Sequence, residues 1–130
     1  KLGCADRITF YGYLISSKLE ECYSRASFCV LPSLADAMPL ALLECMAHGI
    51  PALVSRFPGA EWIIKDGENG FLHEPGNVQK IREQLSFIQS HGDLCARMAD
   101  KARRTVQGNF TWEVTARKTV SVYEKVMNSR

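Results

Sequence analysis

Short, continuous apolar runs alternate along this chain with longer segments whose apolar residues recur at helical spacing. Residues 8–12, 28–32 and 52–55 are short, β-rich runs that predict strands. The run 28–32 shows no polar alternation, which is typical of a parallel strand covered on both faces. Residues 66–70 form a turn signal ahead of a further short run, Phe71-Leu72. The pattern therefore predicts three or four strands.

Helical segments are predicted between and after the strands. The first follows the capping-box pattern of Ser17 and Glu20, and Thr111 can cap the last. Further helices are predicted over 61–65 and from Val78 onward. The residues expected to face inward are Leu19, Cys22, Tyr23 and Ala26 in the first helix and Ala116, Val120, Tyr123 and Met127 in the last.

The helix over 39–48 has the clearest boundaries. Pro39 suits its first position, Gly49 suits a left-handed C-terminal cap, and Pro51 stands where a helix cannot continue. With Pro39 as the first helical residue, Met38 takes the N-cap position.

Alternating strands and helices of these lengths predict an α/β fold with a partial, Rossmann-like, open parallel sheet of three to four strands. The helices flank this sheet, and a helical tail ends the chain. Residues 1–130 are interpreted as one partial domain. Because such open sheets usually carry more strands, we expect the chain to begin partway through a domain and to leave a strand edge uncovered, where copies could associate.

Composition narrows the class of protein. With 130 residues, 46% hydrophobic and 23% charged, the chain is typical of one globular domain, and its net charge of +2 is too small to indicate nucleic acid. The basic segment 97–130 is interpreted as solvated helix faces rather than as a contact for an anionic surface, since its charges alternate with apolar positions. A membrane contact, if made, is expected to be peripheral.

The sequence also predicts the compartment and the state of the cysteines. No apolar run of about 18 residues and no signal-peptide pattern occur, so the expected location is the cytoplasm, including the inner face of a membrane. The five cysteines are interpreted as reduced packing residues. No metal ligands at the usual spacing are found, so no protein-held metal or cofactor is expected.

Polar chemistry concentrates around the helix 39–48. Glu44 and His48 are its only polar residues and share one face. Because an unpaired carboxylate is costly to bury, Glu44 must reach a solvated cleft or a hydroxyl-rich or basic partner. A narrow solvent-exposed stripe explains the two residues equally well from periodicity alone.

The start of this helix is predicted to bind an anion. It follows the carboxyl end of the strand 28–32, where open α/β sheets place their ligands. Free amides around Met38 and Leu40 and the helix dipole favour a phosphate there. Asp36 would project into the same mouth; the alternative, an N-cap role, is disfavoured because Asp36 lies two residues ahead of Met38.

Whole motifs extend these inferences. Residues 31–51, which carry Asp36 and Glu44 with seven residues between them, strongly resemble the donor-site motif of the family-4 retaining glycosyltransferases of GT-B fold. Further matching segments follow in order at 66–72, 75–76, 98–103 and 110–112. The resemblance implies the C-terminal donor-binding domain of such an enzyme, truncated at its N-terminus.

The resemblance also implies roles for four residues. Asp36 would contact the transferred sugar ring near the reacting carbon and is the residue of the pair assigned as catalytic. Glu44 would hold the ribose hydroxyls, and amides at Met38 and Leu40 would face the diphosphate or sugar. The implied reaction moves a glycosyl unit from a UDP-, GDP- or ADP-sugar to an acceptor hydroxyl with retention, without a bound metal.

Departures from the family limit this assignment. Asp36 replaces the more usual Glu, and Pro39 stands where relatives often have Gly, so it has no N–H to donate. Residues 57–62 match the Gly-rich turn only loosely, and neither Gly59 nor Glu61 is assigned a binding role. Two further parts of the family do not precede Lys1: an Arg and Lys pair that clamps the donor, and a domain that binds the sugar, lipid-linked or glycan acceptor. The isolated chain is therefore expected to be inactive.

Two other readings remain open at this point. One is a non-catalytic module that binds a nucleotide sugar or a partner protein. The other is a different enzyme with the same fold, such as an epimerase or a phosphorylase.

Overall fold

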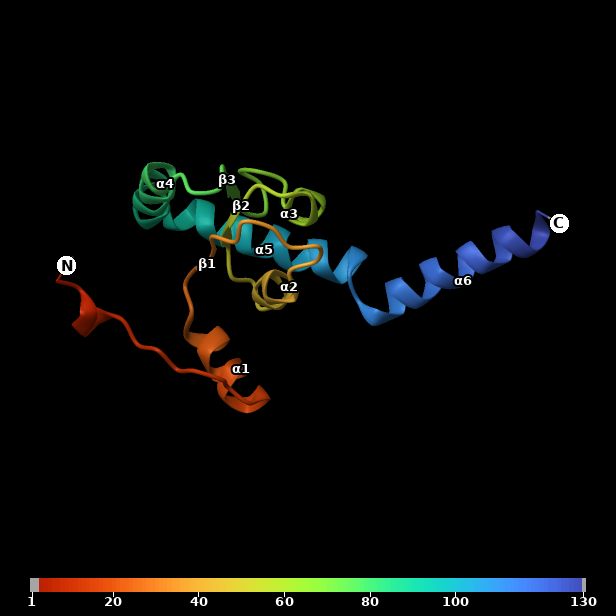
Figure 1. The fold of residues 1–130 in the computed structure, drawn as a ribbon, viewed down its shortest axis with the longest axis horizontal. Helices are drawn as coiled ribbons and strands as arrows, with labels where there is room; N and C mark the ends of the chain where they lie inside the picture. The colour runs from red at the N-terminus through yellow and green to blue at the C-terminus, as the bar shows by residue number, and fades with distance from the viewer. Residues whose placement is uncertain (1–2, 130) are drawn as a thin grey trace.

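Three parallel strands form the central sheet, which Figure 1 shows with helices packed around it. The computed structural model describes residues 3–129. The strands are β1 (Cys29–Leu31), β2 (Ala52–Ser55) and β3 (Phe71–His73), hydrogen-bonded in that order. This arrangement confirms the predicted α/β class with a partial, open, parallel sheet flanked by helices.

The helices connect the strands and then continue the chain beyond them. A short 3-10 helix, η1 (Ala5–Arg7), comes before the first α-helix. The α-helices are α1 (Ser16–Arg25), α2 (Leu40–Ala47), α3 (Pro58–Ile63), α4 (Val78–Ser90), α5 (Gly92–Asn109) and α6 (Trp112–Asn128). Within residues 3–129, none of them is long and apolar enough to cross a membrane.

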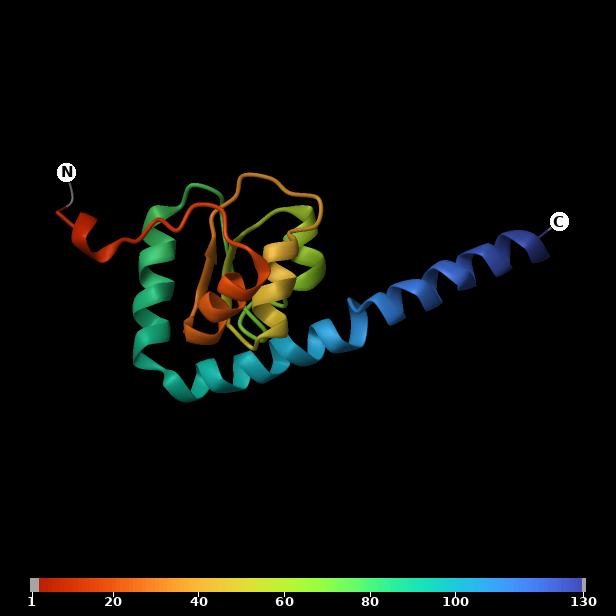
Figure 2. The same ribbon diagram turned by 90° about the horizontal axis from the view of Figure 1, so that it is seen from below.

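The buried core lies between the sheet and the helices α2, α3 and α5. Ala52 and Val54 of β2 point to this side, because alternate residues of a strand face the same way. Leu42 and Met46 of α2 and Ala102 of α5 are fully buried against them. In Figure 2, α5 runs along the lower ends of α2 and the sheet. This packing fixes α2 beside the strands.

The C-terminal end of α2 confirms the predicted boundary. Gly49 has a φ of 71° and lies in the left-handed region. Its amide donates to the carbonyl of Met46 at 2.9 Å, and the amide of Ile50 donates to the carbonyl of Cys45 at 2.9 Å. These two bonds form a Schellman motif, which satisfies carbonyls that the helix leaves open. Pro51 then leads into β2.

The predicted strand over 8–12 is wrong, since these residues form no strand and are exposed. Phe10, for example, is 92% exposed. A strand needs a neighbouring strand for its hydrogen bonds, and no strand in the described part of the chain lies beside this segment. β1 is also less covered than predicted, because Val30 is 41% exposed.

The first helix departs from the prediction at its start. It begins at Ser16 with Ile15 in the N-cap position, and no side chain caps it. Ser17 therefore lies inside the first turn and not at the capping position. No α1 residue is fully buried; Leu19, Cys22 and Tyr23 are half-buried, while Ala26 is exposed.

The predicted inward face of the last helix is wrong as well. Thr111 caps α6 as predicted, accepting from the amide of Val114 at 3.2 Å. Val120, Tyr123 and Met127 are nevertheless exposed, and α6 projects away from the sheet in Figures 1 and 2. Within the described chain, this helix packs mainly against α5, so most of its apolar stripe has no partner there.

One shorter helix is displaced along the chain. The segment predicted as helical over 61–65 instead forms α3, which begins at Pro58 and ends at Ile63. Pro58 occupies the first turn, where its fixed φ favours the helix and its missing N–H costs nothing.

Candidate functional site

The loop after β1 carries Asp36 to the start of α2. The helix begins at Leu40 with Pro39 in the N-cap position, one residue later than predicted, so Met38 is not the cap. Oδ1 of Asp36 accepts a hydrogen bond from the Met38 amide at 3.0 Å. Asp36 therefore closes a local Asx-type turn and does not cap the helix. The amide of Met38 is occupied by this bond.

The loop is held in place by a backbone contact with α3. A Cβ atom added at Gly59 would lie 2.5 Å from the carbonyl oxygen of Ala37 and 2.9 Å from that of Asp36. Such distances are shorter than real Cβ contacts, so only glycine permits this approach. Gly59 thus sets the position of the loop that carries Asp36.

The first turn of α2 offers two amides to a ligand. Among the described residues, the amides of Leu40 and Ala41 have no hydrogen-bond acceptor, whereas the amides of Leu42 and Leu43 donate to the carbonyl of Pro39. Free amides at a helix N-terminus attract anions, and the helix dipole adds to this attraction. The start of α2 is therefore suited to an anionic group.

Glu44 meets a hydroxyl partner from α1. The hydroxyl of Tyr23 donates to Oε2 of Glu44 at 2.7 Å. Burial raises the pKa of the Tyr23 hydroxyl, and the bond to Glu44 raises it further, so the tyrosine stays protonated as a donor. Within residues 3–129, no hydrogen bond reaches Oε1 of Glu44. One carboxylate oxygen is thus held and the other is free.

His48 joins the same contact between α1 and α2. Its Nδ1 lies 2.8 Å from the carbonyl of Glu44, and its Nε2 lies 2.7 Å from Oε2 of Glu20. Both partners are acceptors, so the protonated ring, in which both nitrogens donate, satisfies both contacts. The carbonyl of Glu44 and then the Glu20 carboxylate raise the pKa of His48. The Tyr23 ring packs on it with centroids 4.8 Å apart.

The polar face of α2 combines features of both alternatives. Glu44 is exposed and His48 is half-buried, as the alternative of a solvent-exposed stripe expects, and both are also hydrogen-bonded to side chains of α1.

Met38, Leu40 and Glu44 line one cavity of about 360 Å³. Asp36 is not part of its lining. The opposite wall comes from the α5–α6 junction, which the sequence did not place beside these residues. The remaining lining residues are Leu43, Ala47, Val106, Phe110, Trp112 and Thr115. An available signal was Trp112, a large aromatic residue directly after a predicted helix cap.

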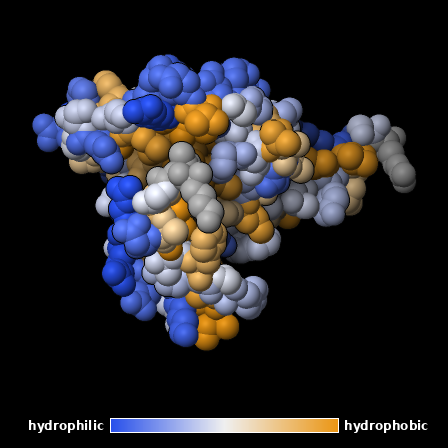
Figure 3. Space-filling model, turned by 60° about the vertical axis from the view of Figure 1, so that its left-hand side comes forward, coloured by the Kyte–Doolittle hydropathy of each residue, from blue (hydrophilic) through white to orange (hydrophobic). Residues whose placement is uncertain are grey.

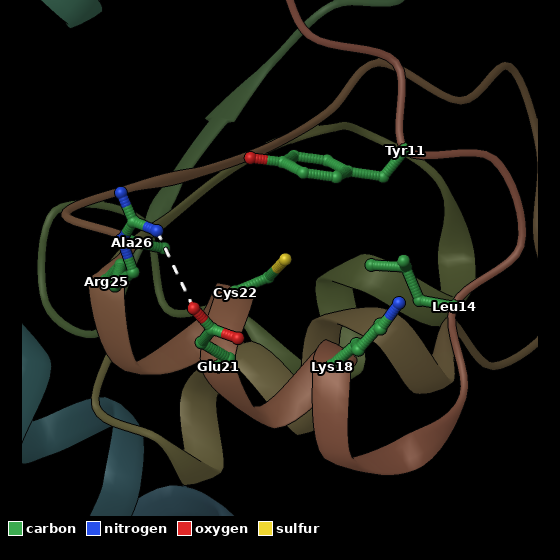
Figure 4. Close-up of a pocket in the computed structure, with 7 residues that line it drawn as sticks. All are labelled: Tyr11, Leu14, Lys18, Glu21, Cys22, Arg25 and Ala26. Carbon is green, nitrogen blue, oxygen red and sulfur yellow. Dashed lines mark ion pairs between the residues drawn. The ribbon is translucent and has the colours of Figure 1, made fainter.

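A larger cavity lies elsewhere in the described part of the chain, between the N-terminal segment and α1. It measures about 560 Å³, and Figure 4 shows Tyr11 facing Cys22 and Leu14 across it, with Arg25 paired to Glu21. These α1 residues lie on the helix face opposite Tyr23. Figure 3, in which the N-terminal side comes forward, shows apolar side chains left uncovered between polar ones. This cavity is therefore separate from the cavity lined by Glu44.

An ion-pair network ties together the carboxyl ends of β2 and β3. Arg56 contacts Glu74 at 3.0 Å through Nε and Glu61 at 2.8 Å through Nη1. Glu61 is thus engaged with Arg56. The network supports the edge of the sheet that also carries the loop of Asp36.

Comparisons with known proteins agree with this geometry. A family model described as glycosyl transferases group 1 matches residues 1–105. An uncharacterised glycosyltransferase of Methanocaldococcus jannaschii is 29% identical over 127 residues, which cover 98% of this chain and 33% of that protein.

Solved structures give the same picture. Sucrose-phosphate synthase from Thermosynechococcus elongatus superposes with a TM-score of 0.86 and 27% identity, covering 97% of this chain and 32% of that one. HepE from Anabaena, solved in complex with UDP-glucose, superposes with a TM-score of 0.87 and 20% identity, covering 95% and 34% of the two chains.

The parallel sheet and the helices that flank it place the chain among α/β proteins of the GT-B type. The chain belongs to the glycosyl transferases group 1 family. It spans about a third of the length of the curated relatives it matches.

Proposed function

We propose that the protein containing this chain transfers a glycosyl unit from a nucleotide diphosphate sugar to an acceptor hydroxyl with retention of configuration. This chain would supply the donor-binding wall. The observation that carries the proposal is the first part of α2. The amides of Leu40 and Ala41 are unpaired there, and Glu44, one turn further along the helix, keeps one carboxylate oxygen free. Family membership gives the class of reaction.

Glu44 is proposed to bind the ribose of the donor. A carboxylate accepts hydrogen bonds from two neighbouring hydroxyls, and such charge-assisted bonds are stronger than neutral ones. The diphosphate or sugar would lie against the amides of Leu40 and Ala41. Met38, whose amide is engaged with Asp36, would contribute its side chain to the wall of the site.

Asp36 is proposed to act at the reacting carbon. In the reaction, the bond between the anomeric carbon and the leaving phosphate oxygen breaks, and a bond to the acceptor oxygen forms on the same face. The acceptor proton passes to the leaving diphosphate. Positive charge develops on the sugar ring, and a fixed carboxylate nearby stabilises that charge. Because one oxygen of Asp36 is tied to the Met38 amide, the group is held in one orientation.

The proposal also names the class of donor and of acceptor. The Anabaena HepE structure contains UDP-glucose, which supports a nucleotide diphosphate sugar as the donor here; the proposal extends to UDP-, GDP- and ADP-sugars. The acceptor, a sugar, lipid-linked or glycan hydroxyl, would bind to parts of the longer protein outside this chain.

The role of Glu44 is tested in the full-length protein with a panel of nucleotide sugars. Glu44→Ala is expected to raise KM for the preferred donor by about 10- to 100-fold, because hydrogen bonds to a charged group contribute about 1.5–3 kcal/mol. Glu124→Ala, at an exposed acid of α6, is the matched control and should leave KM unchanged. An unchanged KM in Glu44→Ala would refute the ribose role, and donor binding without turnover in the unaltered protein would favour a non-catalytic module.

A further inference from the structure

The bond between Tyr23 and Glu44 joins two helices that are far apart in sequence. The residues are 21 positions apart, yet the hydroxyl of Tyr23 and Oε2 of Glu44 lie 2.7 Å from each other. A short bond between a hydroxyl and a carboxylate is charge-assisted and directional. The bond therefore restricts where the carboxylate of Glu44 can point.

Tyr23 is itself held in place before it reaches Glu44. Its ring is half-buried and lies against the ring of His48, with an interplanar angle of 33°. His48 in turn is fixed by the carbonyl of Glu44 and by Glu20 of α1. The hydroxyl thus comes from a framework of packed side chains and not from a freely moving surface residue.

Glu44 needs such restraint because it is exposed on the helix surface. A free glutamate side chain loses rotamer entropy when it is fixed by a ligand. A side chain that is already oriented avoids much of that cost when it binds. The bond from Tyr23 uses Oε2 and leaves Oε1 open to a ligand.

We propose that Tyr23 is a positioning residue for donor binding, which orients the carboxylate of Glu44 toward the ribose hydroxyls of the nucleotide sugar. This inference rests on the proposed role of Glu44. If the bond only fastened α1 to α2, its loss would lower stability. It would not change how strongly the protein prefers a ribose over a 2′-deoxyribose in the nucleotide.

The test uses the full-length protein and the variant Tyr23→Phe, which keeps the ring and removes only the hydroxyl. KM for the donor is expected to rise about five- to tenfold, with kcat changed less than about twofold, since the bond acts on binding and not on the reacting carbon. Tyr13→Phe is the matched control, because Tyr13 is 94% exposed; it should leave both constants unchanged.

A second measurement separates positioning from a merely structural role. The ratio of KM for the 2′-deoxyribose donor to KM for the ribose donor is measured in the unaltered protein and in Tyr23→Phe. If Tyr23 orients Glu44 onto the ribose, the variant should discriminate less between the two donors. Because each ratio is taken within one protein, partial loss of folded enzyme does not alter it.

The outcomes distinguish this inference from the proposed function. A higher KM in Glu44→Ala, with no change of KM or of the donor ratio in Tyr23→Phe, would overturn the positioning role and leave the ribose role intact. No effect of Glu44→Ala would overturn both. In support, Tyr23→Phe should add nothing when Glu44 is already replaced by alanine, because the two side chains act through one contact.

Discussion

At the scale of single residues, the two acids of the site are held by different contacts. Asp36 is fixed through its backbone, since its loop lies against Gly59. Glu44 is fixed through its side chain, by Tyr23. Neither contact is visible in the sequence, because each joins segments that only the folded chain brings together.

The contact at Gly59 predicts the effect of adding one methyl group. Gly59→Ala should push the loop away from α3 and displace Asp36. A displacement of about 1 Å from a reacting group can reduce turnover about 100-fold, so we expect kcat of the full-length enzyme to fall about 10- to 100-fold. Steady-state kinetics measure this change.

The control for that substitution is another helical glycine. At Gly108 in α5, an added Cβ meets nothing within 4 Å. Gly108→Ala should therefore leave kcat unchanged and raise stability by about 1 kcal/mol through its better helix propensity. Equal kcat values for the two variants would show that the loop does not depend on Gly59.

At the scale of elements, local signals explain which boundaries could be predicted. Pro39, Gly49 and Pro51 bound α2 because each acts on its own backbone, and the structure shifts the start by only one residue. The stripe of α6 follows helical spacing equally well. Its burial, however, requires a partner surface, and local spacing does not specify whether one is present.

The contact between α1 and α2 should depend on pH through His48. Its pKa is raised in the folded protein, so its stabilising contribution is fully present below the unfolded value of about 6.5 and is lost as the pH rises through the folded value. The groups that face the His48 ring are Glu20 and Tyr23 of α1 and Glu44 of its own helix. Arg103 of α5 donates a hydrogen bond to the backbone carbonyl of His48 at 3.3 Å.

Thermal unfolding of the unaltered chain and of His48→Gln, measured from pH ~5.5 to pH ~9, checks this expectation. The glutamine side chain carries no titrating charge, so the difference in Tm between the two proteins should be largest at the acidic end and should shrink toward the alkaline end. A difference that grows with pH would contradict a protonated His48 in the folded state.

At the scale of the whole molecule, the sequence predicted the strands of the sheet better than the segments that pack around it. The strand 52–55 matches β2 because its burial follows from its own composition. The segment 8–12 has similar composition but forms no strand, since its hydrogen bonds need a neighbour that the described chain does not provide. The cavity wall at Trp112 was missed for a related reason, because its place depends on how α5 packs against α2.

The same dependence on neighbours leads to a prediction for the isolated 130-residue chain. It carries the proposed donor-binding wall, but it spans about a third of the length of its relatives. Within residues 3–129, the start of α2 has amides suited to a diphosphate, while Arg56, directly after β2, is already paired with two carboxylates. Hydrogen bonds from unpaired cations to a diphosphate are stronger than those from neutral amides, so amides alone should bind it weakly.

We therefore expect the isolated chain to bind UDP-, GDP- and ADP-sugars weakly, with Kd near or above about 1 mM, corresponding to about 4 kcal/mol. It should form no glycoside. Titration calorimetry and product assays, run beside the full-length protein under the same conditions, measure both quantities. Turnover by the chain alone would show that the donor wall and its own side chains suffice for the reaction, and would place the acceptor site within these 130 residues.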